Sequence, residues 1–321
     1  MTEPKVYVLH ENNEWVVPLE KAFQERNIPY EFWFINEGKL DLKDAPPEGV
    51  FYNRMSASAH TRDHRFAIEL SEPIVAWLER HGRRVINGRN ALMLETRKAE
   101  QYLQLQKFGI KTPETVVVNN EEDLIKAAKN FPEAPFLVKP NRGGKGAGVE
   151  LFESADDLEQ KIQSGEVNFH SLDGLILLQQ YVKPASGNIV RLEFIGGKFY
   201  YAVQVDASGG FELCPADECE DDEDAFCPAD GSGGFKILKG YSDNFISTYE
   251  QFLKANDIGI GAIEYVENEH GERYVYDINI NTNYNSGAEE EAGKDYSGMG
   301  QIASYLGQEL EQIKKAKEVI G

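Results

Sequence analysis

The sequence predicts a protein of mixed α/β and α+β class, in which a small parallel βαβ domain precedes two α+β lobes. Strand-like and helix-like stretches alternate over the first ninety residues, and a glycine-rich loop joins two strand-like segments near the middle. Strand-rich blocks fill the last third. Because 321 residues exceed the usual size of one core, we expect domains at residues 1–90, 91–175 and 176–321 that share one cleft.

The first predicted domain has a ligand-binding edge where its strands end. Buried strands are expected at residues 5–10, 30–35, 49–54 and 83–88, and helices at 16–27 and 72–82. In a parallel sheet, ligands bind beyond the carboxyl ends of the strands. Asn53 and Arg54 stand at such an end. An arginine fork suits a carboxylate, so both are predicted to contact substrate, with a plain surface position as the alternative.

The remaining chain predicts two further groups of strands. A helix is expected from residue 91 to Gly109, a second helix at 121–130, and strands on either side of the glycine loop within 135–152. Residues 175–182, 190–205 and 261–280 are strand-rich and predict one antiparallel sheet.

The charge balance restricts the partners of the protein. There are 54 acidic and 33 basic residues, for a net charge of −21, so we expect no nucleic-acid partner. A nucleotide would need a locally basic pocket or a divalent cation. No apolar run is long enough to span a bilayer, and three cysteines, Cys214, Cys219 and Cys227, suit neither a disulfide framework nor a zinc site. We therefore expect a cytoplasmic protein without a membrane partner.

The glycine-rich loop is a candidate phosphate lid. Glycines 143, 144, 146 and 148 surround Lys145, and such a loop lets backbone N–H groups wrap an anion. It is not a P-loop, because neither Ser or Thr nor a helix follows the lysine. A flexible hairpin is the alternative. Lys139, which ends an apolar strand, and Lys98 on the preceding helix are candidate phosphate-binding cations, although a lone lysine is usually solvated.

A polar strand near the end of the chain is a candidate metal site. Asp277, Asn279 and Asn281 alternate with apolar residues and so share one face of a strand. Glu264 lies opposite them if residues 268–271 form a hairpin turn. Carboxylate and amide oxygens suit Mg²⁺. A polar face exposed to water is the alternative.

Two other charged groups suggest no site by themselves. His60 and His64 are four residues apart, but the glutamate of a zinc protease motif is missing between them. The acidic run at 218–224 is most simply a solvated surface loop, with a lid over the substrate as the alternative.

These motifs occur in an order that resembles the ATP-grasp superfamily, in particular RimK-like and glutathione-synthetase-like carboxylate–amine ligases. The resemblance runs from about Arg89 to Asn285. It rests on the Arg97-Lys98 pair, the Leu137-Val138-Lys139-Pro140 strand with its glycine loop, the segment 178–182, Arg191, Glu264 and the strand Asp277-Ile278-Asn279.

The resemblance implies an ATP-grasp fold, with two lobes that clasp ATP behind a parallel N-terminal domain. It implies that Lys98 and Lys139 bind the phosphates under the glycine lid, and that Glu264, Asp277 and Asn279 hold Mg²⁺, with Mn²⁺ as an alternative ion. Gln180, Tyr181 and Val182 would meet adenine, Asn188 would stand near the ribose, and Arg191 would steady the transferred phosphate. The chain departs from its relatives at Gln180 and Asp277, where they commonly carry glutamate, and at Asn188-Ile189-Val190, where they often carry an acidic ribose contact.

The resemblance also implies a reaction, in which ATP activates a carboxylate as an acyl phosphate and an amine displaces the phosphate. The substrates would be a small-molecule or peptide carboxylate and an amine, and a homodimer or higher oligomer is allowed. Three alternatives stay open: a peptide-modifying ligase or macrocyclase, an ATP-grasp small-molecule kinase, and a nucleotide-binding regulator. Asn281 joins Asn53 and Arg54 as a predicted substrate contact.

Overall fold

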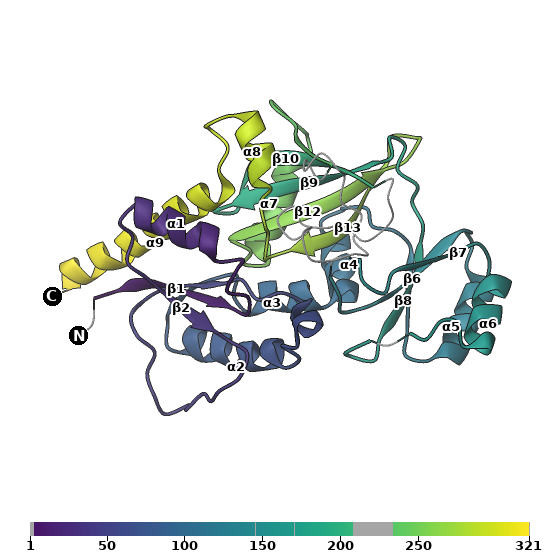
Figure 1. Ribbon diagram of the computed structural model, residues 1–321, viewed down its shortest axis with the longest axis horizontal. Helices are drawn as coiled ribbons and strands as arrows, with labels where there is room; N and C mark the ends of the chain where they lie inside the picture. The colour runs from purple at the N-terminus through teal and green to yellow at the C-terminus, as the bar shows by residue number, and fades with distance from the viewer. Residues whose placement is uncertain (1–2, 145, 170, 208–233, 321) are drawn as a thin grey trace.

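The computed structural model describes residues 3–144, 146–169, 171–207 and 234–320, and three sheets form its framework (Figure 1). The glycine-loop residue Lys145, the three cysteines and the acidic run lie outside these ranges. No helix in the described ranges is long and apolar enough to cross a membrane.

The first sheet is parallel and confirms the parallel N-terminal sheet predicted from the sequence. Its strands lie in the order β2-β1-β3-β4. The strands are β1 (Lys5–His10), β2 (Tyr30–Phe34), β3 (Gly49–Asn53) and β4 (Arg84–Ile86), and the helices of this part are α1 (Val17–Glu25), η1 (Ala59–Arg62) and α2 (Ala67–Arg80). The strand β3 is buried throughout, as its apolar sequence requires.

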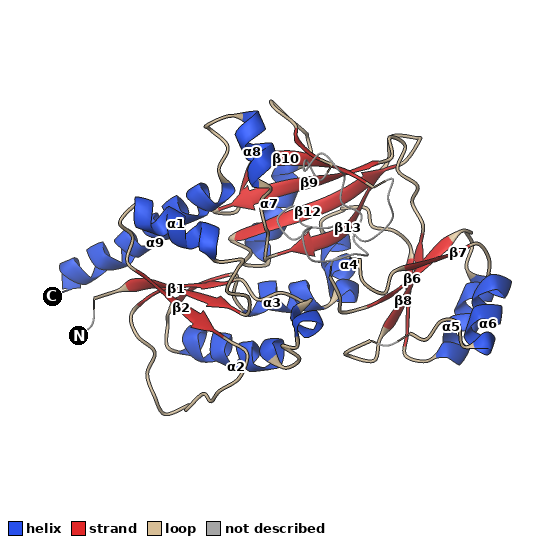
Figure 2. Cartoon of the chain, in the orientation of Figure 1, coloured by secondary structure: helices blue, strands red, loops and turns tan. Residues whose placement is uncertain are grey.

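The second sheet belongs to a small lobe and is antiparallel. Its strands, in the order β5-β8-β6-β7, are β5 (Thr115–Val118), β8 (Ile176–Gln180), β6 (Phe136–Pro140) and β7 (Glu150–Phe152). Helices α5 (Glu121–Asn130) and α6 (Ala155–Ser164) cover one side of it (Figure 2), where Leu124 and Leu158 pack in one cluster with Phe136. Each helix begins with a side-chain cap, from Asn120 and Ser154 respectively.

The position of β8 corrects one prediction. Residues 175–182 were expected to join the sheet of the last lobe, but β8 pairs with β5 and β6 instead. The strand is apolar and buried on both faces, so its sequence gives no sign of which sheet it enters. We propose that the small lobe extends through Gln180.

The prediction of one helix from residue 91 to Gly109 is also wrong, because the helix is interrupted in its middle. It is two helices, α3 (Arg89–Thr96) and α4 (Lys98–Lys107), separated by Arg97 in an extended conformation. Asn141, which follows β6, replaces the missing helical partners: its side-chain oxygen accepts from the Ala99 N–H at 2.9 Å and its carbonyl from the Lys98 N–H at 3.2 Å. A contact distant in sequence therefore ends one helix and begins the next. Gly109 follows the second helix with φ +70°, as predicted for its C-terminal end.

The third sheet is antiparallel, with the order β11-β10-β9-β12-β13. Its strands are β11 (Phe235–Ile237), β10 (Lys198–Asp206), β9 (Asn188–Ile195), β12 (Ile260–Glu267) and β13 (Arg273–Asn279), and the helices of this part are α7 (Ile246–Ala255), α8 (Ser286–Ala292) and α9 (Gly298–Ile320). The chain returns to the first sheet through α9, which lies beside α1 in Figure 1. Leu306 and Leu310 of α9 are buried in one cluster with Val6 and Phe23, so the two ends of the chain share a core.

Asn87 joins the first sheet to the third. It follows β4 with φ +60°, and its buried side chain donates to the carbonyls of Ile260 (2.8 Å) and Ile280 (3.2 Å). Its side-chain oxygen accepts from the Gly259 and Ile260 N–H groups at 2.9 and 3.1 Å. One amide thus satisfies four backbone groups at the junction.

Replacing Asn87 with alanine should lower the free energy of unfolding by about 3 kcal/mol or more, because buried backbone groups lose their partners. Asn87→Gly is the matched control, since it loses the same bonds without strain at positive φ, and it should recover about 1 kcal/mol. Urea denaturation of the three proteins measures both effects. An alanine variant within about 0.5 kcal/mol of the parent would contradict this role.

Candidate active site

A cavity of about 580 Å³ lies between the small sheet, the large sheet and the loop that follows β3. Of the residues predicted from sequence, the cavity lining includes Lys98, Lys139, Gly143, Gly144, Gly146, Gln180, Tyr181, Val182, Arg191, Glu264, Asp277, Asn279 and Asn281. The structure therefore gathers candidates that are up to 183 residues apart, from Lys98 to Asn281, around one space.

Four other predicted residues are absent from the lining. Gly148 lies beyond the lid glycines that face the cavity, and Asn188 donates to the Ser186 carbonyl at 2.9 Å. Asn53 and Arg54 are fully buried behind the cavity wall. The predicted direct contacts of these four with a ligand have no counterpart in the lining.

Lys98 and Asp277 form a half-buried ion pair in the cavity lining, with Nζ donating to Oδ1 at 2.5 Å. Burial alone would lower the pKa of the Lys98 ammonium, but the neighbouring Asp277, with Tyr102 and Glu95, raises it above its ordinary value. The lysine is therefore held in its charged form. It was predicted to meet phosphate, and in this structure it neutralises a predicted metal ligand.

Lys139 is another cation of the cavity lining, and its surroundings differ from those of Lys98. Only 5 % of the residue is exposed, and Nζ donates to the hydroxyl of Tyr102 at 2.8 Å. Among the described residues, no carboxylate oxygen lies within ion-pair distance of it. A lysine so placed is suited to an anionic ligand, because burying an unpaired ammonium is otherwise unfavourable. It stands just before the lid glycines.

The lid itself packs against the N-terminal domain. A side chain at Gly144 would lie 3.1 Å from Cβ of Ser58, in the loop after β3, so the backbone approaches this loop closely. The neighbouring Arg142 is buried and donates to Glu69 of α2 at 2.6 Å. The lid is thus held between the small lobe and α2.

Arg191 lies on β9 and faces two acidic residues. Its guanidinium donates to Glu193 at 2.6 Å and to Glu264 at 3.1 Å. Burial would lower the pKa of Arg191, but these two carboxylates raise it, so the guanidinium stays charged. The second oxygen of Glu193 is buried without a hydrogen-bond partner in the described ranges. The arginine is positioned at the cavity by its carboxylate neighbours.

Glu264, Asp277 and Asn279 meet as the predicted hairpin requires. Glu264 on β12 is paired in register with Asp277 on β13, and the Asn279 side chain donates to Glu264 at 3.1 Å. Burial, with the Asp277 carboxylate close by, raises the pKa of Glu264 even though Arg191 lowers it. Two carboxylates and an amide oxygen are the hard ligands that Mg²⁺ takes, and a divalent cation would relieve the repulsion between the acids. The residues fit the metal.

One end of the cavity is apolar. It follows the segment from Gln180 to Val182, the predicted contact for adenine, and its apolar lining residues include Pro113, Leu137, Val149, Leu151, Ile189, Val205 and Val266. The flat face of a base would bury apolar area there. Gln180 itself is held in place, because its N–H donates to the Glu114 carbonyl at 2.8 Å and its side chain to Glu133 at 2.6 Å.

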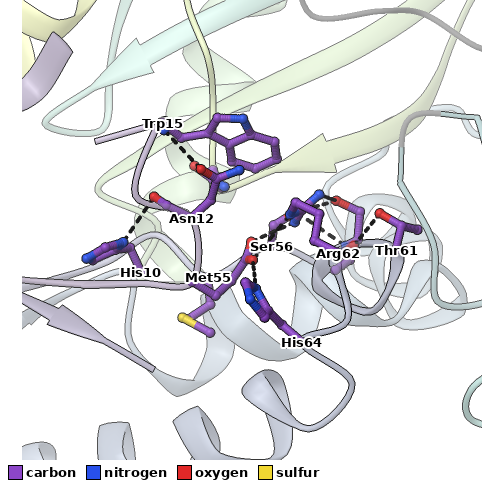
Figure 3. A network of polar contacts seen from close by, with 12 residues as sticks. His10, Asn12, Trp15, Met55, Ser56, Thr61, Arg62 and His64 are labelled. Carbon is purple, nitrogen blue, oxygen red and sulfur yellow. Dashed lines mark hydrogen bonds and ion pairs between the residues drawn. The ribbon is translucent and has the colours of Figure 1, made fainter. Parts of the chain in front are cut away.

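The N-terminal part of the chain contributes Trp15, Ser56 and Ser58 to the cavity lining, and a polar network around Glu11 supports them. This buried carboxylate accepts from Arg62 at 2.6 Å and lies 2.9 Å from Nδ1 of His64. Arg62 also lies over the ring of Trp15, 4.3 Å from its centre, and donates to Ser58 at 3.1 Å. Figure 3 shows Ser56, Arg62 and His64, from the residues that follow β3, together with Trp15 and Asn12, from the segment that follows β1. The network fixes Trp15 and Ser58, which both line the cavity.

Sequence reasoning missed several residues of the site. Asn283 and Asn285 line the cavity and continue the alternation already read at Asp277, Asn279 and Asn281, so the same pattern could have found them. Glu193 lies two residues from Arg191 and shares its strand face. Glu95 gave no signal: it accepts backbone N–H groups from Ala57 (3.0 Å) and Ile280 (2.8 Å), and burial raises its pKa to about 7.

Comparison with known proteins agrees with this geometry. The family model of the RimK-like ATP-grasp domain matches residues 96–212, a range that holds both lysines, the lid, Gln180 and Arg191. The chain carries a RimK-like ATP-grasp domain. The ATP-grasp fold covers nearly the whole chain, including the residues beyond that range. The crystal structure of a RimK domain ATP-grasp protein from Sphaerobacter thermophilus superposes on it with a TM-score of 0.65 at 19 % sequence identity. The superposition covers 94 % of this chain and 98 % of that one.

Two sequence relatives bear the name probable alpha-L-glutamate ligase. The protein of Teredinibacter turnerae is 28 % identical over 137 residues, which are 43 % of this chain and 44 % of that protein. The protein of Shewanella loihica is 24 % identical over 226 residues, covering 70 % of this chain and 68 % of that one. The chain thus matches under half of the length of the first of these relatives.

The pair of Lys98 and Asp277 in the cavity lining predicts an asymmetric mutational response. Lys98→Met should lower the free energy of unfolding by about 3 kcal/mol, because it leaves the half-buried Asp277 without its cation near Glu95 and Glu264. Asp277→Asn should cost less, since it removes a carboxylate from an acidic cluster. The double variant should recover most of the loss.

Chemical denaturation of the four proteins, as a double-mutant cycle, measures the coupling. Additive effects of the two substitutions would show that the pair does not hold the site together.

Proposed function

We propose that the protein is an ATP-dependent carboxylate–amine ligase. The observation that supports the proposal is that a lysine and two carboxylates, from different parts of the chain, line the same cavity. Lys139 and the lid glycines come from the small lobe, while Glu264 and Asp277 come from the large sheet. Phosphoryl transfer requires this combination, because catalysis there consists mainly of positioning and of neutralising charge on the phosphate oxygens.

In the proposed arrangement, ATP lies between the lobes with its base at the apolar end beside Gln180 to Val182. Lys98 and Lys139 bind its phosphates, and the lid excludes water from them. Glu264, Asp277 and Asn279 would hold Mg²⁺, which offsets phosphate charge when bound. Lys98 would then exchange its contact with Asp277 for one with phosphate.

The proposed reaction has two steps. A carboxylate oxygen of the first substrate attacks the γ-phosphorus of ATP, which gives an acyl phosphate and ADP. The nitrogen of an amine then attacks the acyl carbon, loses a proton, and displaces phosphate to leave an amide. Arg191 faces the same cavity and is placed to steady the transferred phosphate. The name of the relatives supports an amino acid such as glutamate as the amine substrate.

Hydroxylamine tests this function, because it enters a small site and converts an acyl phosphate into a hydroxamate. Incubation with Mg-ATP, hydroxylamine and a pool of amino acids and peptides should give ADP, phosphate and a hydroxamate. A stable phosphorylated product without hydroxamate would indicate a kinase instead. ATP binding without any release of ADP would indicate a regulator.

Lys139→Met should reduce the hydroxamate yield by a factor of about 100 or more, since one preorganised cation contributes roughly 3 kcal/mol to such a transition state. Lys126→Met is the matched control. It removes a lysine from the exposed face of α5 and should leave the rate unchanged. Circular dichroism verifies that both variants are folded. Turnover of the Lys139 variant at the parent rate would contradict the assigned role.

A further inference from the structure

A row of amide side chains continues along the cavity past the residues proposed to hold the metal. Asn281, Asn283 and Asn285 all line the cavity, whereas Ile280, Thr282 and Tyr284 between them are buried. The alternation of strand β13 thus persists beyond its last residue, Asn279. Each two-residue step along an extended chain advances about 7 Å, so the row begins one step past the metal residues.

A buried arginine fixes the orientation of two of these amides. Nε of Arg54 donates to Oδ1 of Asn281 at 3.0 Å, and Nη2 donates to Oδ1 of Asn283 at 2.9 Å. A guanidinium can only donate, so the atoms facing it must be the amide oxygens. The NH₂ groups of both asparagines are therefore turned away from Arg54.

The amide nitrogens of this row have no acceptor among the residues that the structure describes. Within the described residues, neither Nδ2 of Asn281 nor that of Asn283 has a hydrogen-bond partner. The Asn285 oxygen accepts from the Ala288 N–H at 2.6 Å, where it caps α8, and its nitrogen is buried with no partner in the described part of the chain. A buried donor without an acceptor is costly, and the half-buried amide nitrogens of Asn281 and Asn283 remain free to donate, so this wall suits a ligand that accepts hydrogen bonds.

The charge of Arg54 identifies that ligand as an anion. The residue is 2 % exposed, and its three partners are the two asparagines and the Trp15 carbonyl at 2.8 Å, all of them neutral. In the described part of the chain, no carboxylate lies within ion-pair distance of it. Glu11, the acid that acts on it from farther away, is already bound by Arg62 and His64. A buried cation without a counter-ion is unfavourable, and an anion in the cavity would compensate it.

We propose that Asn281, Asn283 and Asn285 form the subsite for the free carboxylate of the amine substrate, with Arg54 as the positioning residue behind them. This proposal rests on the proposed ligase function and assigns residues to the carboxylate of its amine substrate. The amine substrate is an amino acid whose own carboxylate is not activated. Its carboxylate accepts from the amide row, while its amine extends toward the site of the acyl phosphate.

The subsite predicts a variant that separates stability from binding. Asn283→Asp keeps an oxygen for Arg54 and gives the guanidinium an ionic partner, so the melting temperature should rise. The same change places a negative charge, with no NH₂ donor, where the substrate carboxylate binds. Binding of amino acids should therefore be lost while the fold becomes more stable.

The experiment measures melting shifts of the full chain in Mg-ADP with each of the twenty amino acids and with the matching α-carboxamides. At least one amino acid should bind, and its carboxamide should bind about tenfold more weakly or worse, because charge-assisted hydrogen bonds are lost. In Asn283→Asp this preference for the acid should vanish. Asn120→Asp, at the exposed cap of α5, adds the same charge elsewhere and should keep it.

Three results would overturn the subsite: no amino acid binds, the carboxamides bind as well as the acids, or Asn283→Asp retains the preference for acids. The shift caused by Mg-ADP alone is recorded for every protein. A parent chain without that shift would refute the proposed function, whereas a normal ADP shift without acid preference would refute only the subsite.

Discussion

The ion pair between Lys98 and Asp277 is the contact on which the arrangement of the site depends. Lys98 is the first residue of α4, because Asn141 interrupts the preceding helix and receives the new N-terminus. Asn141 in turn directly precedes Arg142 and the lid glycines. The pair therefore connects the helix, the lid and the strand β13, three elements that are distant in the sequence, at a distance of 2.5 Å.

Compensation of buried charge explains the rest of the cavity. On a chain with a net charge of −21, the cations Lys98 and Arg191 are retained inside because acids surround them. Lys139 and Arg54 lack such partners among the described residues, and both are turned to the cavity or stand behind its wall. We propose that the two cations left without acids each face an anionic ligand: the phosphates at Lys139 and a carboxylate in front of Arg54.

The sequence predicted the fold well where the signal was a local one, such as the spacing of apolar residues or a short motif. The parallel first sheet, the hairpin that pairs Glu264 with Asp277 and the lid between β6 and β7 follow from apolar patterning and glycine spacing. The sequence did not predict the parts of the fold that depend on contacts between residues far apart in the chain. The break at Arg97 depends on Asn141, and β8 has apolar residues on both faces that suit either sheet. Arg54 and Asn281 were both predicted as substrate contacts. The burial of Arg54 behind Asn281 was not predicted, since it is a property of the tertiary structure.

Crystals grown with ADP and Mn²⁺ would test the central claim most directly, because Mn²⁺ scatters anomalously and substitutes for Mg²⁺ at oxygen sites. The account predicts an anomalous peak within about 2.5 Å of oxygens from Glu264 and Asp277. It also predicts that the Lys98 ammonium leaves Asp277 and contacts a phosphate oxygen. Bound ADP with no metal at these carboxylates, and with the Lys98–Asp277 pair unchanged, would contradict the account.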